Sequence, residues 1–185
     1  MRVEPWSRET APRSEELVRA IEVRRGGKLM NLDRMLLWSE PLARGWNGYL
    51  GALRQEIALP PFLRELAICV VARLTGADYE YHHHAPELRK AGASDAQLTL
   101  LDDPDLAASS PLFDELQQAV IRFAIASTRH VHIPDALFDA LKRRLSPTEI
   151  VELVAVTAAY NMVARFLVAL EVTPEGEAAA ASGAR

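Results

Sequence analysis

The chain has 185 residues, with 21 Lys and Arg against 25 Asp and Glu, which gives a formal net charge of −4. This length suits one domain with a real hydrophobic core, and the ordinary composition argues against a fibrous or disordered protein. The mild acidity and the lack of a long basic run argue against a general nucleic-acid binder.

Cysteine usage narrows the chemistry further. Cys69 is the only cysteine, so the chain forms no internal disulfide, no CxxC redox pair and no multi-cysteine zinc site. Met1–Arg13 lacks the apolar core of a signal peptide, and no run reaches the roughly 18 consecutive apolar residues of a membrane span. We therefore expect a cytoplasmic protein that does not associate with a membrane.

The first half of the chain reads as a series of helices. Ser14 is a suitable N-cap for a helix that ends at the two glycines 26 and 27, and Leu32, Met35 and Leu36 recur at helical spacing. Proline in the first turn and glycine after the last are typical of helix ends. The further helices predicted on these signals are Pro41–Ile57, Pro61–Leu74 and Asp78–Ala91.

The second half continues in the same way. A capping box begins at Ser94, and Ser146 followed by Pro147 and Glu149 is the clearest helix start in the chain. Helices are predicted from Ser110 to Arg129, from Ile133 onward, and from Pro147 to Val172. No long apolar–polar alternation indicates a strand. The expected organisation is an all-α domain over 14–172, with mobile tails at 1–13 and 173–185.

Glu65 is the first candidate for chemistry. Its neighbours on the same helical face, Phe62, Ile68 and Cys69, are apolar or small. Burial on such a face would raise the pKa of the carboxyl group toward the range that is useful for proton transfer. The alternative is an ion pair between Glu65 and a nearby arginine, for example one across the helix packing.

The run from Tyr79 to His84 contains a second set of candidates. Glu80 and His84 are four residues apart and share a helical face, and a carboxylate beside an imidazole fixes the ring's tautomer and raises its basicity. We expect Tyr79 and His83 to contact a substrate. The alternative for Glu80 and His84 is an exposed pair on the helix surface with no role in catalysis.

Three further features have structural interpretations beside functional ones. Glu80 and His84, together with His130 and His132, could hold a metal, although their spacing matches no zinc motif and we expect none. Cys69 is expected to pack as a small hydrophobe. Asn161 and Arg165, four residues apart in an apolar helix, could brace Glu65 or bind an acidic ligand, and the alternative is a structural role with Arg165 as an ion-pair partner.

The stretch Leu59–Leu101 resembles the carboxymuconolactone decarboxylase/alkylhydroperoxidase D-like family. It contains a helical Glu65, the segment Gly76-Ala-Asp-Tyr-Glu80, and then a histidine and a glycine. Arg25–Leu32 and Leu145–Phe166 resemble the flanking helices of the family. The resemblance implies an all-α bundle built around a helical hairpin, assembled as trimers or hexamers.

The same resemblance indicates which branch of the family fits. In the peroxidase branch a Glu precedes a CxxC pair that is followed by a His; here Glu65 and His84 match the acid and the histidine, while Ala77 and Glu80 occupy the cysteine positions. Without a dithiol there is no disulfide cycle to reduce a hydroperoxide. The decarboxylase branch needs no cysteines and fits better.

We therefore expect an enzyme that needs no cofactor and acts on a small carboxylated lactone or a related organic acid. In this hypothesis His84 is the general acid/base, Glu80 orients it, Glu65 carries a second proton, and Arg165 holds a substrate carboxylate. A degenerate member of the peroxidase branch and a non-catalytic oligomeric binding protein are the alternatives.

Overall fold

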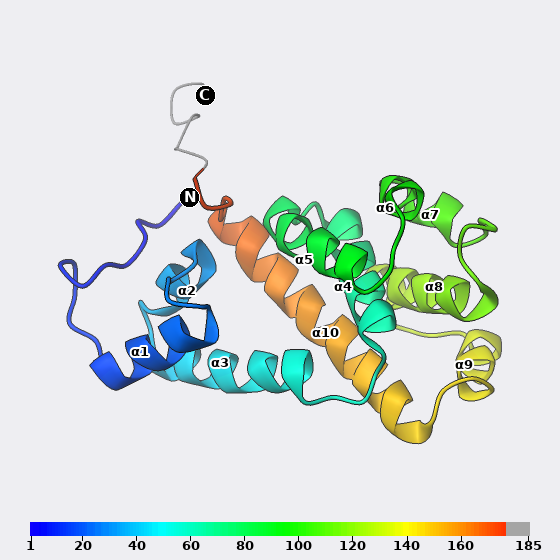
Figure 1. Cartoon of the computed structure of the whole chain (residues 1–185), viewed down its shortest axis with the longest axis horizontal. Coiled ribbons are helices and arrows are strands. Elements are labelled where there is room, and N and C mark those ends of the chain that lie inside the picture. The colour runs from blue at the N-terminus through cyan, green and yellow to red at the C-terminus, as the bar shows by residue number, and fades with distance from the viewer. Residues whose placement is uncertain (177–185) are drawn as a thin grey trace. The chain divides into compact units, whose positions relative to one another are not determined.

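The computed structural model describes residues 1–176, which form ten α-helices and no strand (Figure 1). The all-α prediction is confirmed. The helices are α1 (Glu15–Arg24), α2 (Asn31–Leu36), α3 (Glu40–Gln55), α4 (Pro61–Thr75), α5 (Asp78–Lys90), α6 (Asp95–Leu100), α7 (Pro104–Ala107), α8 (Glu115–His130), α9 (Asp135–Lys142) and α10 (Pro147–Leu170).

The chain divides into two compact units where the sequence suggested a single domain. One unit consists of Met1–Gln55 together with the residues from Ala169 onward, and the other of Glu56–Val168. The first unit therefore contains α1 to α3, and the second contains α4 to α9 and most of α10.

The N-terminal segment, expected to be a mobile tail, is packed into the first unit. Trp6 is only 1% exposed and donates its indole N–H to the carbonyl of Ala11. Arg13 donates to the carbonyl of Leu37, ahead of the Ser14 cap of α1. Of the expected C-terminal tail, the described residues begin with Thr173, whose carbonyl accepts a hydrogen bond from Asn31, and 177–185 lie outside the described part.

A buried carboxylate holds the turn between α1 and α2. Asp33 is 2% exposed and receives Arg25 Nε at 2.9 Å and Arg25 Nη2 at 3.0 Å. It also caps α2 by accepting from the backbone N–H of Met30. The fork geometry of the guanidinium matches both carboxylate oxygens, so this pair fixes how the chain passes through the turn.

Helix α4 is the centre of the second unit, and its most extensive contacts are with α5 and α8. Its residues from Glu65 to Ala72 are all buried. The helix ends at Gly76, which adopts a left-handed conformation with φ of 67° that a side chain would strain. The chain reverses there, and α4 and α5 form a helical hairpin.

Most helix boundaries agree with the sequence signals, but the start of α8 does not. Ser110 and Pro111 lie in a turn, and α8 begins at Glu115 because Asp114 and Gln117 form the capping box. A short helix, α7, precedes this turn and is capped by Asp103, whose side chain accepts from the backbone N–H of Leu106. Helix α7 was not predicted from the sequence.

Helix α10 is capped as predicted, with Ser146 and Glu149 exchanging backbone and side-chain hydrogen bonds. Among the described helices it alone has the length and hydropathy of a membrane span, and half of that apolar window is buried within the protein. A core helix of a water-soluble protein has the same properties, so this feature is weak support for membrane association.

Candidate active site

The α4–α5 hairpin brings together two of the predicted catalytic residues, Glu65 and His84. Glu65 lies on the second turn of α4 and is 3% exposed, while the side chain of His84 on α5 is 12% exposed. The distance between His84 Nδ1 and Glu65 Oε2 is 2.7 Å. A carboxylate only accepts hydrogen bonds, so Nδ1 carries the hydrogen and the lone pair of the neutral ring lies on Nε2.

An aromatic ring from a third helix completes the setting of the imidazole. Tyr160 of α10 is buried, and its ring meets the His84 ring edge to face, with 4.9 Å between the centroids. Such contacts stabilise a ring in one orientation. The imidazole is therefore held by a hydrogen bond from α4 and by packing from α10.

Glu65 has a second partner that the sequence analysis did not identify. Arg64 Nε donates to Glu65 Oε1 at 2.9 Å. Burial raises the pKa of Glu65, but the hydrogen bond and charge of His84, followed by those of Arg64, lower it more, and the net pKa lies below its ordinary value. The predicted raised pKa is wrong, because two positively polarised partners outweigh the burial. Glu65 is thus a carboxylate with one oxygen bonded to His84 and the other to Arg64.

Glu80 is buried on α5, one turn before His84, and is 2% exposed. Its charge and that of Glu65 act on Cys69 of α4: burial, then Glu65, then Glu80 raise the pKa of the thiol well above its ordinary value. Cys69 therefore stays a neutral thiol among these residues. His84 Nδ1 donates its hydrogen bond to Glu65, in the orienting position that was expected for Glu80.

The two residues expected to contact a substrate pack against each other. Tyr79 is buried and its ring lies 4.5 Å from that of His83, while His83 also meets the exposed His82 edge to face at 5.0 Å. These rings form a contiguous aromatic group on α5, next to Glu80.

Arg165 does not contact the Glu65–His84 pair in the structure. Its Nη1 donates to both the backbone and the side-chain oxygen of Asn161, each at 2.9 Å. Asn161 in turn donates to Thr128 on α8. Five residues along a helix rotate the side chain by about 140°, so Arg165 points away from the direction of Tyr160. Through these hydrogen bonds Asn161 and Arg165 connect α10 to α8. This is a structural role, which was one of the alternatives expected from the sequence.

The remaining histidines lie elsewhere. His130 ends α8 and His132 follows it, and both are exposed. Within residues 1–176, no group of three or more His, Cys, Asp and Glu side chains is arranged to hold a metal ion. Two surface cavities within the described residues involve none of the residues above.

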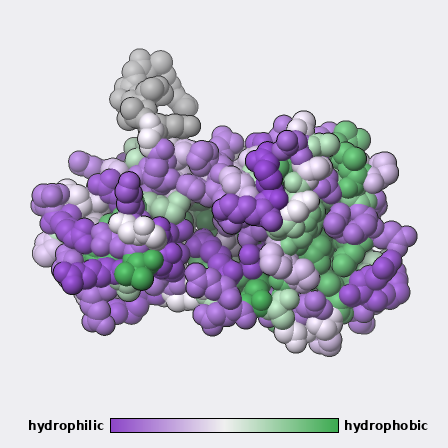
Figure 2. Space-filling model, in the orientation of Figure 1, coloured by the Kyte–Doolittle hydropathy of each residue, from purple (hydrophilic) through white to green (hydrophobic). Residues whose placement is uncertain are grey.

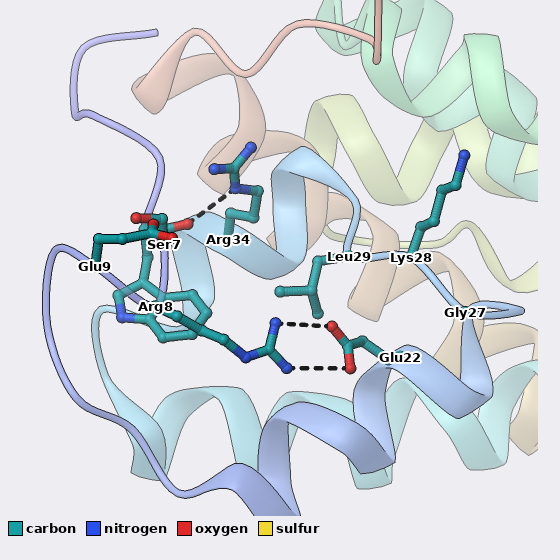
Figure 3. A pocket seen from close by; sticks show the side chains of 9 residues that line it. Ser7, Arg8, Glu9, Glu22, Gly27, Lys28, Leu29 and Arg34 are labelled. Atoms are coloured by element: carbon teal, nitrogen blue, oxygen red, sulfur yellow. Dashed lines mark hydrogen bonds and ion pairs between the residues drawn. The ribbon is translucent and has the colours of Figure 1, made fainter.

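One cavity, of about 430 Å³, lies in the first unit and is bounded by the N-terminal segment, α1 and the glycine turn. Figure 3 shows Arg8 facing Glu22 across it, with both guanidinium nitrogens bonded to the carboxylate, while Lys28 points away from that pair. Arg8 and Glu22 thus form an ion pair within this cavity. The other cavity, of about 440 Å³, lies between α8 and α9 in the second unit.

Comparison with known proteins agrees with this fold. Residues 40–111 match the sequence profile of the Carboxymuconolactone decarboxylase family. The match includes the α4–α5 hairpin with Glu65 and His84. A search of curated proteins finds no match to the chain.

Several solved structures share the fold at low identity. The core of an alkylhydroperoxidase AhpD, described as an uncharacterized peroxidase-related protein from Ralstonia eutropha JMP134, has a TM-score of 0.79 at 19% identity, covering 95% of this chain and 93% of that one. A peroxidase-related protein from Silicibacter sp. TM1040 has a TM-score of 0.75 at 19%, covering 96% and 90%. A variant of the debrominase Bmp8 in complex with 2,3,4-tribromopyrrole has a TM-score of 0.75 at 22%, covering 94% and 91%.

The fold class is thus an AhpD-like helical bundle, with a buried acid and a histidine on its hairpin. The part of the chain that matches the Carboxymuconolactone decarboxylase profile, residues 40–111, contains Leu59–Leu101, the main stretch that carries the sequence resemblance.

Proposed function

We propose that this protein is an enzyme that carries out acid–base chemistry on a small organic acid, a carboxylated lactone or a related β,γ-unsaturated acid. The supporting observation is the 2.7 Å contact between the carboxylate of Glu65 and Nδ1 of His84 in a setting largely closed to water. A histidine with a fixed tautomer is the usual proton-transfer group at neutral pH. We place the enzyme in the cytoplasm.

In the proposed reaction the C–C bond to the substrate carboxylate breaks and carbon dioxide leaves. The electron pair stays on the substrate carbon, where conjugation with the lactone carbonyl delocalises it, so the substrate itself serves as the electron sink. The imidazolium of His84 delivers a proton from Nε2 to that carbon. The ring then takes a proton from solvent, and the overall reaction consumes one proton for each carbon dioxide released.

Glu65 acts on His84 in this proposal and does not exchange a proton itself. Its depressed pKa keeps it negative at neutral pH, and a negative partner on Nδ1 stabilises the imidazolium that forms during the cycle. Arg64 holds the other carboxylate oxygen, which fixes the direction of the carboxylate plane. Arg165 has no part in the proposal, because its guanidinium is bound to Asn161.

Two observations favour this chemistry over a thiol peroxidase. Ala77 and Glu80 stand at the positions of the cysteine pair of the peroxidase branch. The remaining thiol, Cys69, is fully buried and has a raised pKa, whereas a reactive cysteine is an accessible thiolate.

The experiment measures carbon dioxide release and product absorbance with carboxylated butenolides as substrates. His84→Gln is expected to lower kcat by about 100-fold or more, the usual contribution of a positioned acid or base. His130→Gln removes an exposed imidazole from the end of α8 and serves as the matched control with unchanged rates.

Two results would contradict the proposal. One is an unchanged rate in His84→Gln when circular dichroism shows the fold is kept. The other is sustained consumption of an organic hydroperoxide with a dithiol reductant that disappears in Cys69→Ser, which would assign the protein to peroxide chemistry.

A further inference from the structure

The cavity between α8 and α9 has a charge pattern that the proposed reaction does not use. Helix α8 contributes Glu115, Leu116, Ala119 and Arg122, which share one face at helical spacing. Its volume of about 440 Å³ lies within the range typical of small-molecule sites. None of its lining residues belongs to the Glu65–His84 site.

The opposite wall comes from the end of α9. Ala140, in the last turn of α9, and Arg143 and Arg144, which directly follow that helix, line the cavity there. Together with Arg122, the cavity thus holds three guanidinium groups against the single carboxylate of Glu115. Figure 2 shows hydrophobic surface gathered at the end of the molecule where α7, α8 and α9 lie, with hydrophilic residues beside it.

The three arginines differ in how far they are already satisfied. Arg122 gives one nitrogen, Nη1, to the carbonyl of Ala108 and has further donors. Arg144 pairs with Glu115 at 2.6 Å, but their side chains are 56% and 85% exposed, so the pair contributes little to stability and is easily exchanged. Arg143 makes no side-chain hydrogen bond or ion pair with any described residue.

The surface between the charges is apolar. Ala119 is buried, and Leu116 and Ala140 are half-buried. A guanidinium fork matches a carboxylate through two parallel hydrogen bonds, and an apolar floor favours a compact hydrocarbon body next to it. Inorganic anions would satisfy the arginines and leave this floor in contact with water.

We propose that this cavity binds a small organic anion, with its carboxylate held by Arg143 and Arg122 and its apolar body against Leu116, Ala119 and Ala140. It is a second ligand site, separate from the proposed acid–base site. Its ligand class is that of aromatic or alicyclic carboxylates.

Benzoate is the probe, measured by isothermal titration calorimetry in a chloride buffer, with benzamide as the uncharged analogue. Benzoate is expected to bind once per chain and benzamide not at all. Arg143→Gln is expected to weaken benzoate binding by about tenfold or more. Arg44→Gln, which removes an exposed arginine from α3 in the other unit, is the matched control and leaves the affinity unchanged.

Two further variants of cavity residues keep the test independent of folding. Glu115→Gln releases Arg144, so benzoate is expected to bind severalfold more tightly, which an unfolded variant could not do. Ala140→Leu fills part of the floor and is expected to weaken benzoate while leaving inorganic phosphate unaffected. His84→Gln is expected to leave benzoate binding intact, because His84 does not line this cavity. The two proposed sites can therefore be tested separately.

Several results would overturn the inference. They are no benzoate binding up to roughly 10 mM, equal weakening by Arg143→Gln and Arg44→Gln, and phosphate binding as tight as benzoate with no effect of Ala140→Leu. Loss of benzoate binding in His84→Gln, with Arg143→Gln unchanged, would place the ligand at the other site.

Discussion

Replacing Glu65 with glutamine tests the central contact of the candidate site. The substitution keeps the shape of the side chain and removes its charge. Glu65 accepts hydrogen bonds from His84 at 2.7 Å and from Arg64 at 2.9 Å, and these partners are only 12% and 16% exposed. The perturbation therefore affects two short, sheltered, charge-assisted contacts.

The expected magnitude follows from those contacts. A hydrogen bond to a charged group contributes about 1.5–3 kcal/mol, and breaking a buried ion pair costs about 3–5 kcal/mol. In Glu65→Gln the amide oxygen still accepts from one partner, while the amide N–H group faces the donor of the other. We therefore expect the free energy of unfolding to fall by about 2–4 kcal/mol at pH 7.

The dependence on pH gives the sign of the effect. The pKa of Glu65 in the folded protein is lowered, while in the unfolded chain it is about 4.3. A depressed carboxyl pKa stabilises the folded state above the unfolded pKa, and this stabilisation is lost as pH falls through the folded value. The difference between wild type and Glu65→Gln should therefore persist at pH 5 and shrink below about pH 4.

Urea unfolding followed by far-UV circular dichroism measures both quantities. Glu87→Gln is the matched control, because Glu87 lies on α5 and pairs with Lys90 at the surface. Its effect should stay within about 0.5 kcal/mol. A loss below about 1 kcal/mol in Glu65→Gln at pH 7, or a difference that grows as the pH falls below 4, would refute the reasoning.

Three other predictions concern stability, reactivity and assembly. Asp33→Asn removes the carboxylate held by Arg25 and should destabilise the first unit by about 3 kcal/mol; tryptophan fluorescence reports on this, because all three tryptophans lie within residues 1–55, and an unchanged transition would contradict it. Cys69 is fully buried and should react with Ellman's reagent only after unfolding; prompt reaction of the native protein would disprove its burial. Light scattering should give a trimer or hexamer, since α10 exposes Val151, Val154 and Met162; a mass of 20.5 kDa would exclude this.

The sequence predicts helix boundaries well wherever a cap is local. Ser14, Gly92 and the pair Ser146 and Glu149 act through residues at most four positions away, so their signals can be read without knowing the fold. The prediction was wrong at Ser110 and Pro111, because the stronger capping box of Asp114 lies just beyond them. Two competing local signals cannot be ranked by pattern alone.

Burial at the N-terminus was not predictable in this way. Trp6 lies in a short polar segment with prolines on both sides and has no periodic apolar partners in the sequence. Two hydrogen bonds to Arg34 of α2 hold the segment in place. The backbone N–H of Trp6 donates to the carbonyl of Arg34, and Arg34 Nε donates to the carbonyl of Trp6. Such long-range contacts leave no pattern in the segment itself.

Some features of the candidate site were predicted from the sequence, and others became clear only from the structure. The resemblance in sequence pointed to Glu65 and His84, and the structure places them in contact. Arg64 was missed because consecutive residues on a helix point in different directions, yet its long side chain reaches the carboxylate. The pKa of Glu65 was wrong in sign because burial and hydrogen bonding oppose each other, and only coordinates show which is larger.

The corrected sign changes what the proposed enzyme can do. If Glu65 stays negative, the Glu65–His84 pair contains one group that cycles between protonation states, the imidazole. A reaction that needs an acid and a base at the same moment would require a second such group. Loss of carbon dioxide needs only one proton, delivered to the carbon that the carboxylate leaves, and the ring regains it from solvent. A permanently charged Glu65 therefore fits decarboxylation through His84 alone better than the scheme predicted from the sequence, in which Glu65 carries a second proton. It leaves His84 as the one residue of this pair whose removal is expected to abolish proton transfer.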